Sequence, residues 1–336
     1  MTNNNTAILL MNIGTPDSPH VDDVRKYLSQ FLNDPKVIDL PFLFRKILVN
    51  LIIIPFRAPK SAKLYEKIWD AEGSPLLYHS ISLQNKLQQL LNQNNKVFLA
   101  MRYGNPSIKS TLNKIKEEGF TDIIAVPLFP QWASSSTLTA INAVQREIDL
   151  WEQRPKLRMV NQFYAHPKFI STFVNQIKNF ELSSYDHIIF SYHGLPISHI
   201  QASHPENDCQ SCDCNISMPS CGEYCYKATC YATTRLLSKE LNLKPNQYSQ
   251  GFQSRLTKKW ITPFTDNIIR DKALEGTKKI LVIAPAFVTD CLETIIEIGI
   301  EYKELFIANG GTTLDYVPSL NDSDQWAEAL KEIIEV

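Results

Sequence analysis

Residues 7–13 read Ala-Ile-Leu-Leu-Met-Asn-Ile, and the break Gly14-Thr15-Pro16 separates them from an amphipathic stretch over residues 21–33. A short apolar run followed by a turn and then by helical periodicity predicts a buried strand that leads into a helix. Further strands are predicted on the same grounds at 97–101, 123–128, 187–191, 248–253 and 280–284. Such strands, connected by helices, are typical of parallel sheets covered on both faces. The sequence therefore predicts an α/β fold.

The length of 336 residues favours two domains, on a prior of roughly 150 residues each. We expect an open, Rossmann-like parallel sheet in residues 1–166 and another in residues 167–317. Residues 318–336 are expected to form a C-terminal helix that packs on the first domain. Neither a G-x-G-x-x-G fingerprint nor a phosphate-binding loop occurs, so dinucleotide and nucleoside triphosphate binding have no motif to support them.

Charge and composition exclude some classes of protein. The chain has 34 basic and 35 acidic residues, for a net charge of -1, which is not the charge of a general nucleic-acid binder. Hydrophobic residues make up 44%, as is normal for a soluble globular protein. The polar start Met1–Thr6 has no secretory pattern, so we expect a cytoplasmic protein.

Two groups of residues lie where a parallel sheet binds ligands, just beyond the carboxyl ends of its strands. His193 follows the strand predicted at 187–191, and imidazole titrates near neutral pH. A helix is predicted after the strand at 280–284, and it carries Glu293, Glu297 and Glu301 at a spacing of four. A structural histidine and a solvated acidic face are the alternatives. Because isoleucines crowd the same helix, the acidic stripe favours cation or proton handling.

Six of the seven cysteines fall within 22 residues. A C-x-x-C pair followed by closely spaced cysteines is typical of a tetrathiolate site for zinc or for an iron–sulfur cluster. Free thiols are the third interpretation. The set comprises Cys209, Cys212, Cys214, Cys221, Cys225 and Cys230.

Residues 40–57 are unusually apolar, but Arg45 and Lys46 interrupt them. The uninterrupted part is shorter than the ~20 residues that a membrane-spanning helix needs. A core-facing helix is one interpretation. The other is an exposed lip that contacts a membrane or admits an apolar substrate.

Taken together, these residues resemble the ferrochelatase family over nearly the whole length of the chain. The blocks that carry the resemblance are 10–16 (LMNIGTP), 100–106 (AMRYGNP), 127–132 (PLFPQW), 191–196 (SYHGLP), 253–255 (QSR) and 290–294 (DCLET). The resemblance implies a chelatase fold with its active-site cleft between the two α/β domains. It also implies a lyase that inserts Fe²⁺ into protoporphyrin IX, with release of two protons, in the last step of haem biosynthesis.

The resemblance assigns roles residue by residue. His193 and Glu293 match the catalytic pair that contacts the metal, and Asp290, Glu297 and Glu301 match a path for protons or metal. The positions that match porphyrin-binding residues are Ile13, Arg57, Arg102, Tyr103 and Trp260.

Some features stay open under the resemblance. Residues 204–226 look like an insertion, and the family includes members with a [2Fe–2S] cluster, so we expect a cluster on four of the six cysteines. The apolar segment aligns with the family's lip, which favours peripheral contact with the inner membrane. The alternative functions are a coproporphyrin III ferrochelatase and a non-catalytic haem or iron–sulfur sensor on the same scaffold.

Overall fold

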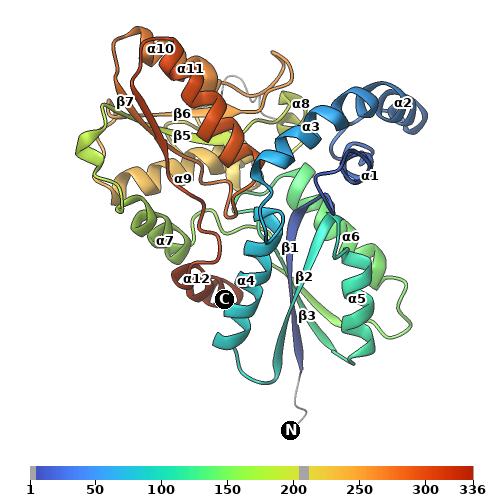
Figure 1. The fold of residues 1–336 in the computed structure, drawn as a ribbon. Helices are drawn as coiled ribbons and strands as arrows, with labels where there is room; N and C mark the ends of the chain where they lie inside the picture. Colours follow the sequence, from blue (N-terminus) through green and yellow to red (C-terminus); the bar gives the residue numbers. More distant parts are fainter. Residues whose placement is uncertain (1–4, 204–211, 336) are drawn as a thin grey trace. The chain divides into compact units, whose positions relative to one another are not determined.

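The computed structural model describes residues 5–203 and 212–335, and the chain divides into two compact units (Figure 1). The first unit comprises residues 5–129, 134–162 and 322–335. Its elements are β1 (Thr6–Thr15), α1 (Val21–Leu32), α2 (Phe42–Ile47), η1 (Leu48–Ile53), α3 (Ile54–Ile68), α4 (Pro75–Leu90), β2 (Asn95–Gly104), α5 (Ile108–Glu117), β3 (Asp122–Pro127), η2 (Ser134–Leu138), α6 (Thr139–Ile148), β4 (Lys156–Met159) and α12 (Asp324–Glu335).

The first sheet is parallel throughout and has the strand order β2-β1-β3-β4. Helices α5 and α6 pack on one face of it, and α4 covers the other face and packs against α12 (Figure 1). Because both faces are covered, nearly every residue of the central strand β1 is buried. The sequence of β1 reads as a continuous apolar run for this reason.

Gly14 shows how closely β1 and β2 approach at their carboxyl ends. It has a φ of +107° and pairs in register with Tyr103. A Cβ atom at this position would lie 1.7 Å from the Tyr103 carbonyl oxygen. Only glycine fits both the left-handed backbone and the contact.

The second unit comprises residues 130–133 and 163–321. It repeats the arrangement of the first, with a parallel sheet in the order β6-β5-β7-β8. Its elements are α7 (Pro167–Ile177), η3 (Leu182–Ser184), β5 (His187–His193), α8 (Ile197–Gln201), η4 (Gly222–Tyr224), α9 (Tyr226–Glu240), β6 (Tyr248–Gln253), α10 (Thr265–Leu274), β7 (Lys279–Ile283), η5 (Glu293–Tyr302), α11 (Lys303–Ala308) and β8 (Thr313–Tyr316).

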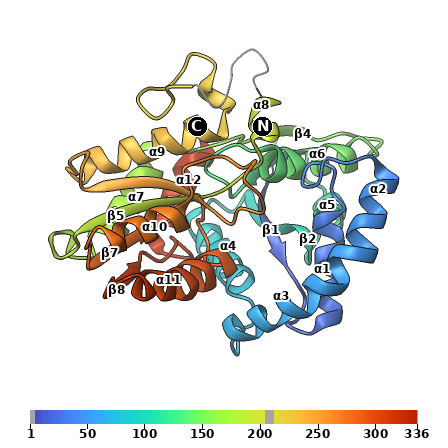
Figure 2. The ribbon, with the colours of Figure 1, turned by 90° about the horizontal axis from the view of Figure 1, so that it is seen from above.

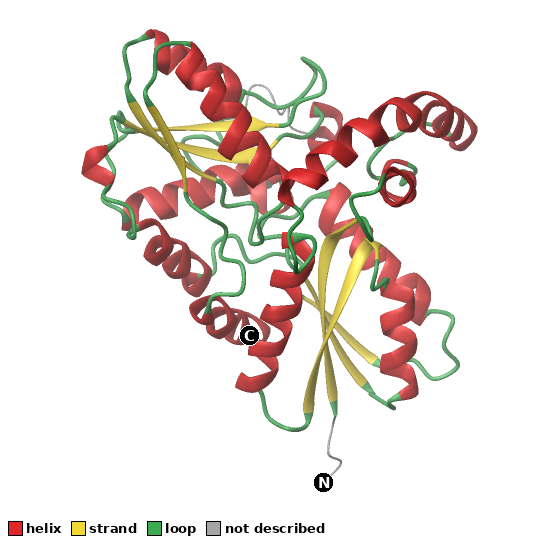
Figure 3. Ribbon diagram, viewed as in Figure 1, coloured by secondary structure: helices red, strands yellow, loops and turns green. Residues whose placement is uncertain are grey.

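Helices cover both faces of the second sheet as well. In Figure 2, α7 and α9 lie on one side of β5, and α10 and α11 lie on the other side. Side chains of α10, η5 and α11 form a core with β5, β7 and β8. Figure 3 shows the strands of each sheet in yellow between their helices. In both sheets the strand order reverses at the central strand, which is where open α/β sheets bind ligands.

The six predicted strands are all present, as β1, β2, β3, β5, β6 and β7. Two four-residue strands at the sheet edges, β4 and β8, have no counterpart among the predictions. The predicted C-terminal helix is α12, which packs against α4 of the first unit. Within the described ranges, no helix has the length and apolar character needed to cross a membrane.

Candidate active site

His193 is the last residue of β5, at the carboxyl end of the central strand of the second sheet. Its ring Nδ1 lies 2.6 Å from the carbonyl oxygen of Gly194. Because a carbonyl can only accept a hydrogen bond, this contact requires the proton to be on Nδ1. In the neutral imidazole the lone pair is then on Nε2, where it can accept a proton or bind a metal ion.

Two aromatic rings flank the imidazole of His193. The ring centroids of Trp260 and Phe287 lie 6.2 Å and 6.3 Å from its centroid. A Cβ atom on Gly194 would lie 3.1 Å from the Trp260 indole and 2.7 Å from the Gln253 carbonyl oxygen, so glycine allows this close packing. The structure therefore brings Trp260, a residue expected at the porphyrin, next to His193.

Glu293 begins η5, which follows β7, the neighbour of β5 in the sheet. One residue of the expected catalytic pair thus ends a strand, and the other lies in the segment that follows the neighbouring parallel strand. The predicted helix is present, but η5 is a π-helix, with i→i+5 hydrogen bonds, rather than an α-helix. Helical segments of this kind are rare and often occur at functional sites.

The amide of Gln253 bridges β5 and the start of η5. Gln253 ends β6 in register with His193. Its side chain accepts a hydrogen bond from the Ser191 hydroxyl at 2.7 Å and donates to the Glu293 carbonyl oxygen at 3.2 Å. The backbone of Glu293 is thus tied to the strand that carries His193.

The other acidic residues near Glu293 differ in their surroundings. Asp290 is buried and accepts hydrogen bonds from Thr294 at 2.8 Å and from the Asn321 amide at 2.7 Å. Glu297 accepts several hydrogen bonds, whereas Glu301 lies on the exposed side of η5. Cys291 is buried, and burial, followed by the neighbouring Glu293 carboxylate, raises the pKa of its thiol well above the usual value.

In the first unit, the expected porphyrin residues lie near the ends of β1 and β2. Ile13 is half-buried at the end of β1. Arg102 donates to the Asp34 carboxylate at 2.5 Å, and the hydroxyl of the buried Tyr103 donates to the same oxygen at 3.0 Å. Thr139 donates to that oxygen at 2.6 Å. Asp34 is therefore the centre of a buried network that supports Arg102.

Asp34 is a residue that the sequence did not single out. Burial disfavours its charge, but hydrogen bonds from Thr139 and the Lys36 amide, together with Arg102, outweigh burial and lower its pKa. Burial, and the nearby Asp34 charge, raise the pKa of Tyr103. The signal in the sequence was an acidic residue directly after a predicted helix, which has many ordinary explanations.

Comparison with known proteins decides the family. The family model described as ferrochelatase matches residues 5–336. The chain belongs to the ferrochelatase family. The ferrochelatase of Coxiella burnetii (strain Dugway 5J108-111) is 43% identical over 338 aligned residues, which cover 98% of this chain and 93% of that protein. The ferrochelatase of Legionella pneumophila (strain Lens) is 42% identical, with 98% of each chain covered.

Solved structures support the fold of this ferrochelatase. SirB from Bacillus subtilis with Fe³⁺ superposes with a TM-score of 0.57 at 11% identity, covering 98% of this chain and 94% of that chain. The sirohydrochlorin chelatase SirB from Bacillus subtilis subspecies spizizenii, in complex with cobalt, gives a TM-score of 0.54 at 11% identity. It covers 98% and 96% of the two chains. The predicted α/β chelatase fold with two parallel sheets is confirmed.

The apolar lip of this ferrochelatase, residues 40–57, forms α2, η1 and the start of α3. Arg45 is buried and donates to the Leu40 carbonyl oxygen at 2.6 Å, which anchors the segment. Arg57 is exposed at its end. Several large side chains are exposed, so the core-facing interpretation is wrong for them: Phe42 (67%), Leu43 (65%), Phe44 (68%), Leu51 (71%) and Phe56 (72%).

The cysteine-rich segment of the ferrochelatase is described from Cys212 onward, and Cys209 lies outside the described residues. Cys214, Cys225 and Cys230 are buried, and Cys221 is exposed. Burial, together with the neighbouring thiols of Cys212 and Cys225, raises the pKa of Cys214 to about 12. In the part of the chain that the structure describes, no three His, Cys, Asp or Glu side chains are placed to hold a metal ion.

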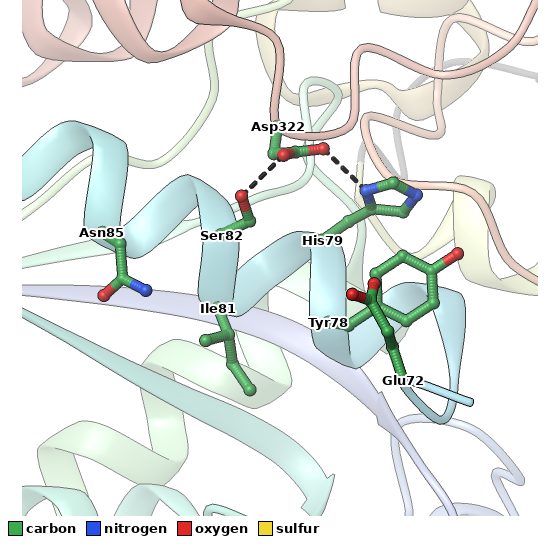
Figure 4. A pocket seen from close by; sticks show the side chains of 7 residues that line it. All are labelled: Glu72, Tyr78, His79, Ile81, Ser82, Asn85 and Asp322. Atoms are coloured by element: carbon green, nitrogen blue, oxygen red, sulfur yellow. Dashed lines mark hydrogen bonds and ion pairs between the residues drawn. The ribbon is translucent and has the colours of Figure 1, made fainter. Parts of the chain in front are cut away.

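A separate cavity of about 480 Å³ lies in the first unit, where the segment before α12 meets α4 (Figure 4). His79 Nδ1 and Ser82 Oγ both point at the carboxylate of Asp322, at 2.7 Å and 2.6 Å. Lys86 donates to the Asp322 carbonyl oxygen at 2.6 Å. These contacts fasten residue 322 to α4. His79, which the sequence gave no special role, has a structural one.

Proposed function

We propose that this ferrochelatase inserts Fe²⁺ into protoporphyrin IX, with His193 as the base and Glu293 as the carboxylate that meets the iron. The observation that carries the proposal is that His193 ends β5 and Glu293 follows the adjacent strand β7. Gln253 is hydrogen-bonded both to Ser191 of β5 and to the Glu293 carbonyl oxygen. The carboxyl ends of strands at such a reversal of strand order are where α/β sheets bind ligands.

The tautomer of His193 supports its role as the base. A porphyrin must lose two N–H protons when the iron enters, and the iron must lose its bound water. With Nδ1–H committed to the Gly194 carbonyl, the Nε2 lone pair is the atom that accepts a pyrrole proton. The proton then leaves the imidazolium for solvent, so that the next pyrrole proton can follow.

Glu293 supplies a carboxylate, a hard oxygen ligand suited to a hydrated divalent cation. Its backbone is held by Gln253, while its side chain is half-buried. Asp290 is occupied by Thr294 and Asn321, so we assign it to the support of η5 rather than to transport. We propose that Glu301, on the exposed side of η5, provides the outer part of the acidic path.

Porphyrin contact is proposed for the residues that the resemblance indicates. Trp260 lies beside His193, and Ile13 is half-buried at the end of β1. Arg57 is exposed, and Arg102 is held by Asp34 with its side chain 16% exposed. Tyr103 is buried, and its hydroxyl bonds to Asp34, so its contribution is to hold Arg102 in place.

The activity is tested with purified protein, Fe²⁺ and porphyrin under anaerobic conditions, by the loss of porphyrin fluorescence. We expect protoporphyrin IX to turn over faster than coproporphyrin III. Faster turnover of coproporphyrin III would reassign the substrate, and no insertion into either porphyrin would favour a sensor. The variant Glu293→Gln is expected to lose insertion while it still binds porphyrin. Glu304→Gln, on the exposed face of α11, is the matched control.

We propose that the lip contacts the surface of the inner membrane from the cytoplasmic side. Three exposed phenylalanines and neighbouring leucines form an apolar surface, and Lys46 and Arg57 provide positive charge beside it. Apolar side chains next to basic ones suit an anionic bilayer interface. Co-sedimentation with vesicles of anionic lipid tests this. The double variant Phe44→Glu/Leu51→Glu should lose binding, and unchanged binding would contradict the proposal.

The [2Fe–2S] cluster is a proposal that rests on the grouping of cysteine thiols around Cys214. The described cysteines do not form a set of ligands as placed, so no step of the reaction passes through a cluster. An anaerobic absorption spectrum of the purified protein, with an assay for labile sulfide, tests the proposal. Absence of both signals would reject it, and bound zinc would favour a structural metal site.

A further inference from the structure

The side chain of Glu297 is surrounded by hydrogen-bond donors. Its two carboxylate oxygens accept from the Gln253 amide at 3.0 Å, the Ser254 backbone N–H at 2.8 Å, the Ser254 hydroxyl at 2.5 Å and the Tyr302 hydroxyl at 2.9 Å. An ionised carboxylate offers about four lone-pair sites. Four donors therefore occupy the acceptor sites of the Glu297 carboxylate. A metal ion or a transferred proton would have to displace one of these donors.

Ser254 gives a second reason to regard Glu297 as a fixed element. Its φ is +62°, a left-handed conformation that non-glycine residues adopt only when the surroundings hold them there. Glu297 accepts both the backbone N–H and the hydroxyl of Ser254. The turn at the end of β6 is thus held by η5.

Gln253 connects this carboxylate to the strand that carries His193 and to the backbone of Glu293. Gln253 is 1% exposed, and its Oε1 accepts a hydrogen bond from the hydroxyl of Ser191, two residues before His193. Its Nε2 donates both to the Glu293 carbonyl oxygen and to Glu297. Its own carbonyl accepts from the Gly194 backbone N–H at 2.8 Å. One amide therefore contacts the β5 side and the η5 side of the site.

We propose that Gln253 and Glu297 form a brace that sets the separation of His193 and Glu293, and that Glu297 is a positioning residue rather than a step of the metal path. This inference rests on the proposed roles of His193 and Glu293. Removing one contact of the brace lets the start of η5 shift relative to β5. A displacement of about 1 Å in a catalytic pair costs roughly 100-fold in rate.

The test separates kcat from the KM for Fe²⁺ in the full chain with protoporphyrin IX. Glu297→Gln places an amide N–H₂ against the Gln253 donor, and Gln253→Leu removes the bridge. Each is expected to lower kcat by roughly 10- to 100-fold with the KM for Fe²⁺ within about twofold of wild type. The kcat of the double variant should be no lower than that of the more impaired single variant, because both substitutions break the same hydrogen-bonded brace. Glu304→Gln is the control.

A rise of tenfold or more in the KM for Fe²⁺ on Glu297→Gln, with kcat retained, would show that Glu297 handles iron and would overturn the proposal. The proposal would also be overturned if the fold-decreases in kcat of the two single variants multiplied in the double variant. Thermal unfolding and porphyrin binding show whether each variant is folded, and Glu297→Asp serves where Glu297→Gln does not fold. The proposed function would be contradicted by a different result, namely a wild-type protein that inserts no iron or an active His193→Ala variant. If only the brace proposal is wrong, wild type is active and Glu297→Gln has the same kcat as wild type.

Discussion

The Nδ1–H of His193 donates to the Gly194 carbonyl oxygen, 2.6 Å away, within one residue of the end of β5. This bond determines which nitrogen of the ring is the base. Its acceptor is a backbone carbonyl of the same Ser-Tyr-His-Gly stretch. We predict that ¹⁵N–¹H correlation spectra of the histidine side chains show His193 as the Nδ1–H tautomer at neutral pH. An Nε2–H tautomer would contradict the geometry of the proposed base.

The buried network in the first unit predicts a loss of stability. Asp34→Asn removes the charge that pairs with Arg102, and we expect it to lower the free energy of unfolding by about 3 kcal/mol, as breaking a buried ion pair does. Urea denaturation measures this. Asp22→Asn breaks the exposed Asp22–Arg25 pair and should cost less than about 1 kcal/mol. Equal effects of the two variants would contradict the network.

The lowered pKa of Asp34 also predicts an acid dependence. Because its folded pKa lies below the usual 3.8, its contribution to stability is present above pH 4 and is lost as the pH falls through the folded value. The free energy of unfolding of Asp34→Asn should therefore fall less steeply than that of wild type below pH 4. Parallel acid curves for the two proteins would show that Asp34 is not paired in the folded state.

The lowered pKa of His187 predicts that the stability of the fold depends on pH in a different range. Burial is the main cause that lowers its pKa from 6.5 to about 4, and its ring contacts Ser249 at 2.8 Å. The unfolded chain binds more protons than the folded chain between these values, so stability is full above pH 6.5 and falls toward pH 4. His187→Gln should flatten the curve in this window. A His187 ring that titrates near 6.5 by NMR would contradict the burial.

Close packing at the end of β1 gives a further prediction. Gly14→Ala places a methyl group 1.7 Å from the Tyr103 carbonyl oxygen in a left-handed backbone. We expect the variant to lose at least about 3 kcal/mol of stability or not to fold. Gly119→Ala, which also has a positive φ but meets no atom within 4 Å, is the matched control and should lose less. Equal losses would assign the cost to the backbone alone.

The parts of the fold that the sequence predicted are those with strong local patterns. The central strands are nearly continuous apolar runs because both faces of each sheet are covered. This pattern placed His193 at the end of one strand and Glu293 in the helix that follows another. The edge strands β4 and β8 are four residues long and partly exposed, so neither had a recognisable pattern. The spacing of Glu293, Glu297 and Glu301 predicted a helix but not its π type, which depends on backbone pairing.

The polar networks could not be predicted from the sequence, for a different reason. Asp34 meets Arg102 and Thr139, which lie 68 and 105 residues further along the chain, and Gln253 meets Glu297 after 44 residues. Such pairs exist only once the sheets have brought distant strand ends together. The sequence likewise did not distinguish the glutamates of the stripe from one another. In the folded protein Glu297 accepts several hydrogen bonds, whereas Glu301 lies on the exposed side of η5.

The central claim is that His193 is the base of iron insertion, and anaerobic insertion of Fe²⁺ into protoporphyrin IX by His193→Ala tests it most directly. Wild type and the control His20→Ala, at an exposed histidine outside the site, should form haem at the same rate. His193→Ala should bind the porphyrin and insert iron at least about 100 times more slowly, as the loss of a general base predicts. Haem formation by His193→Ala at a rate near that of wild type would contradict the account.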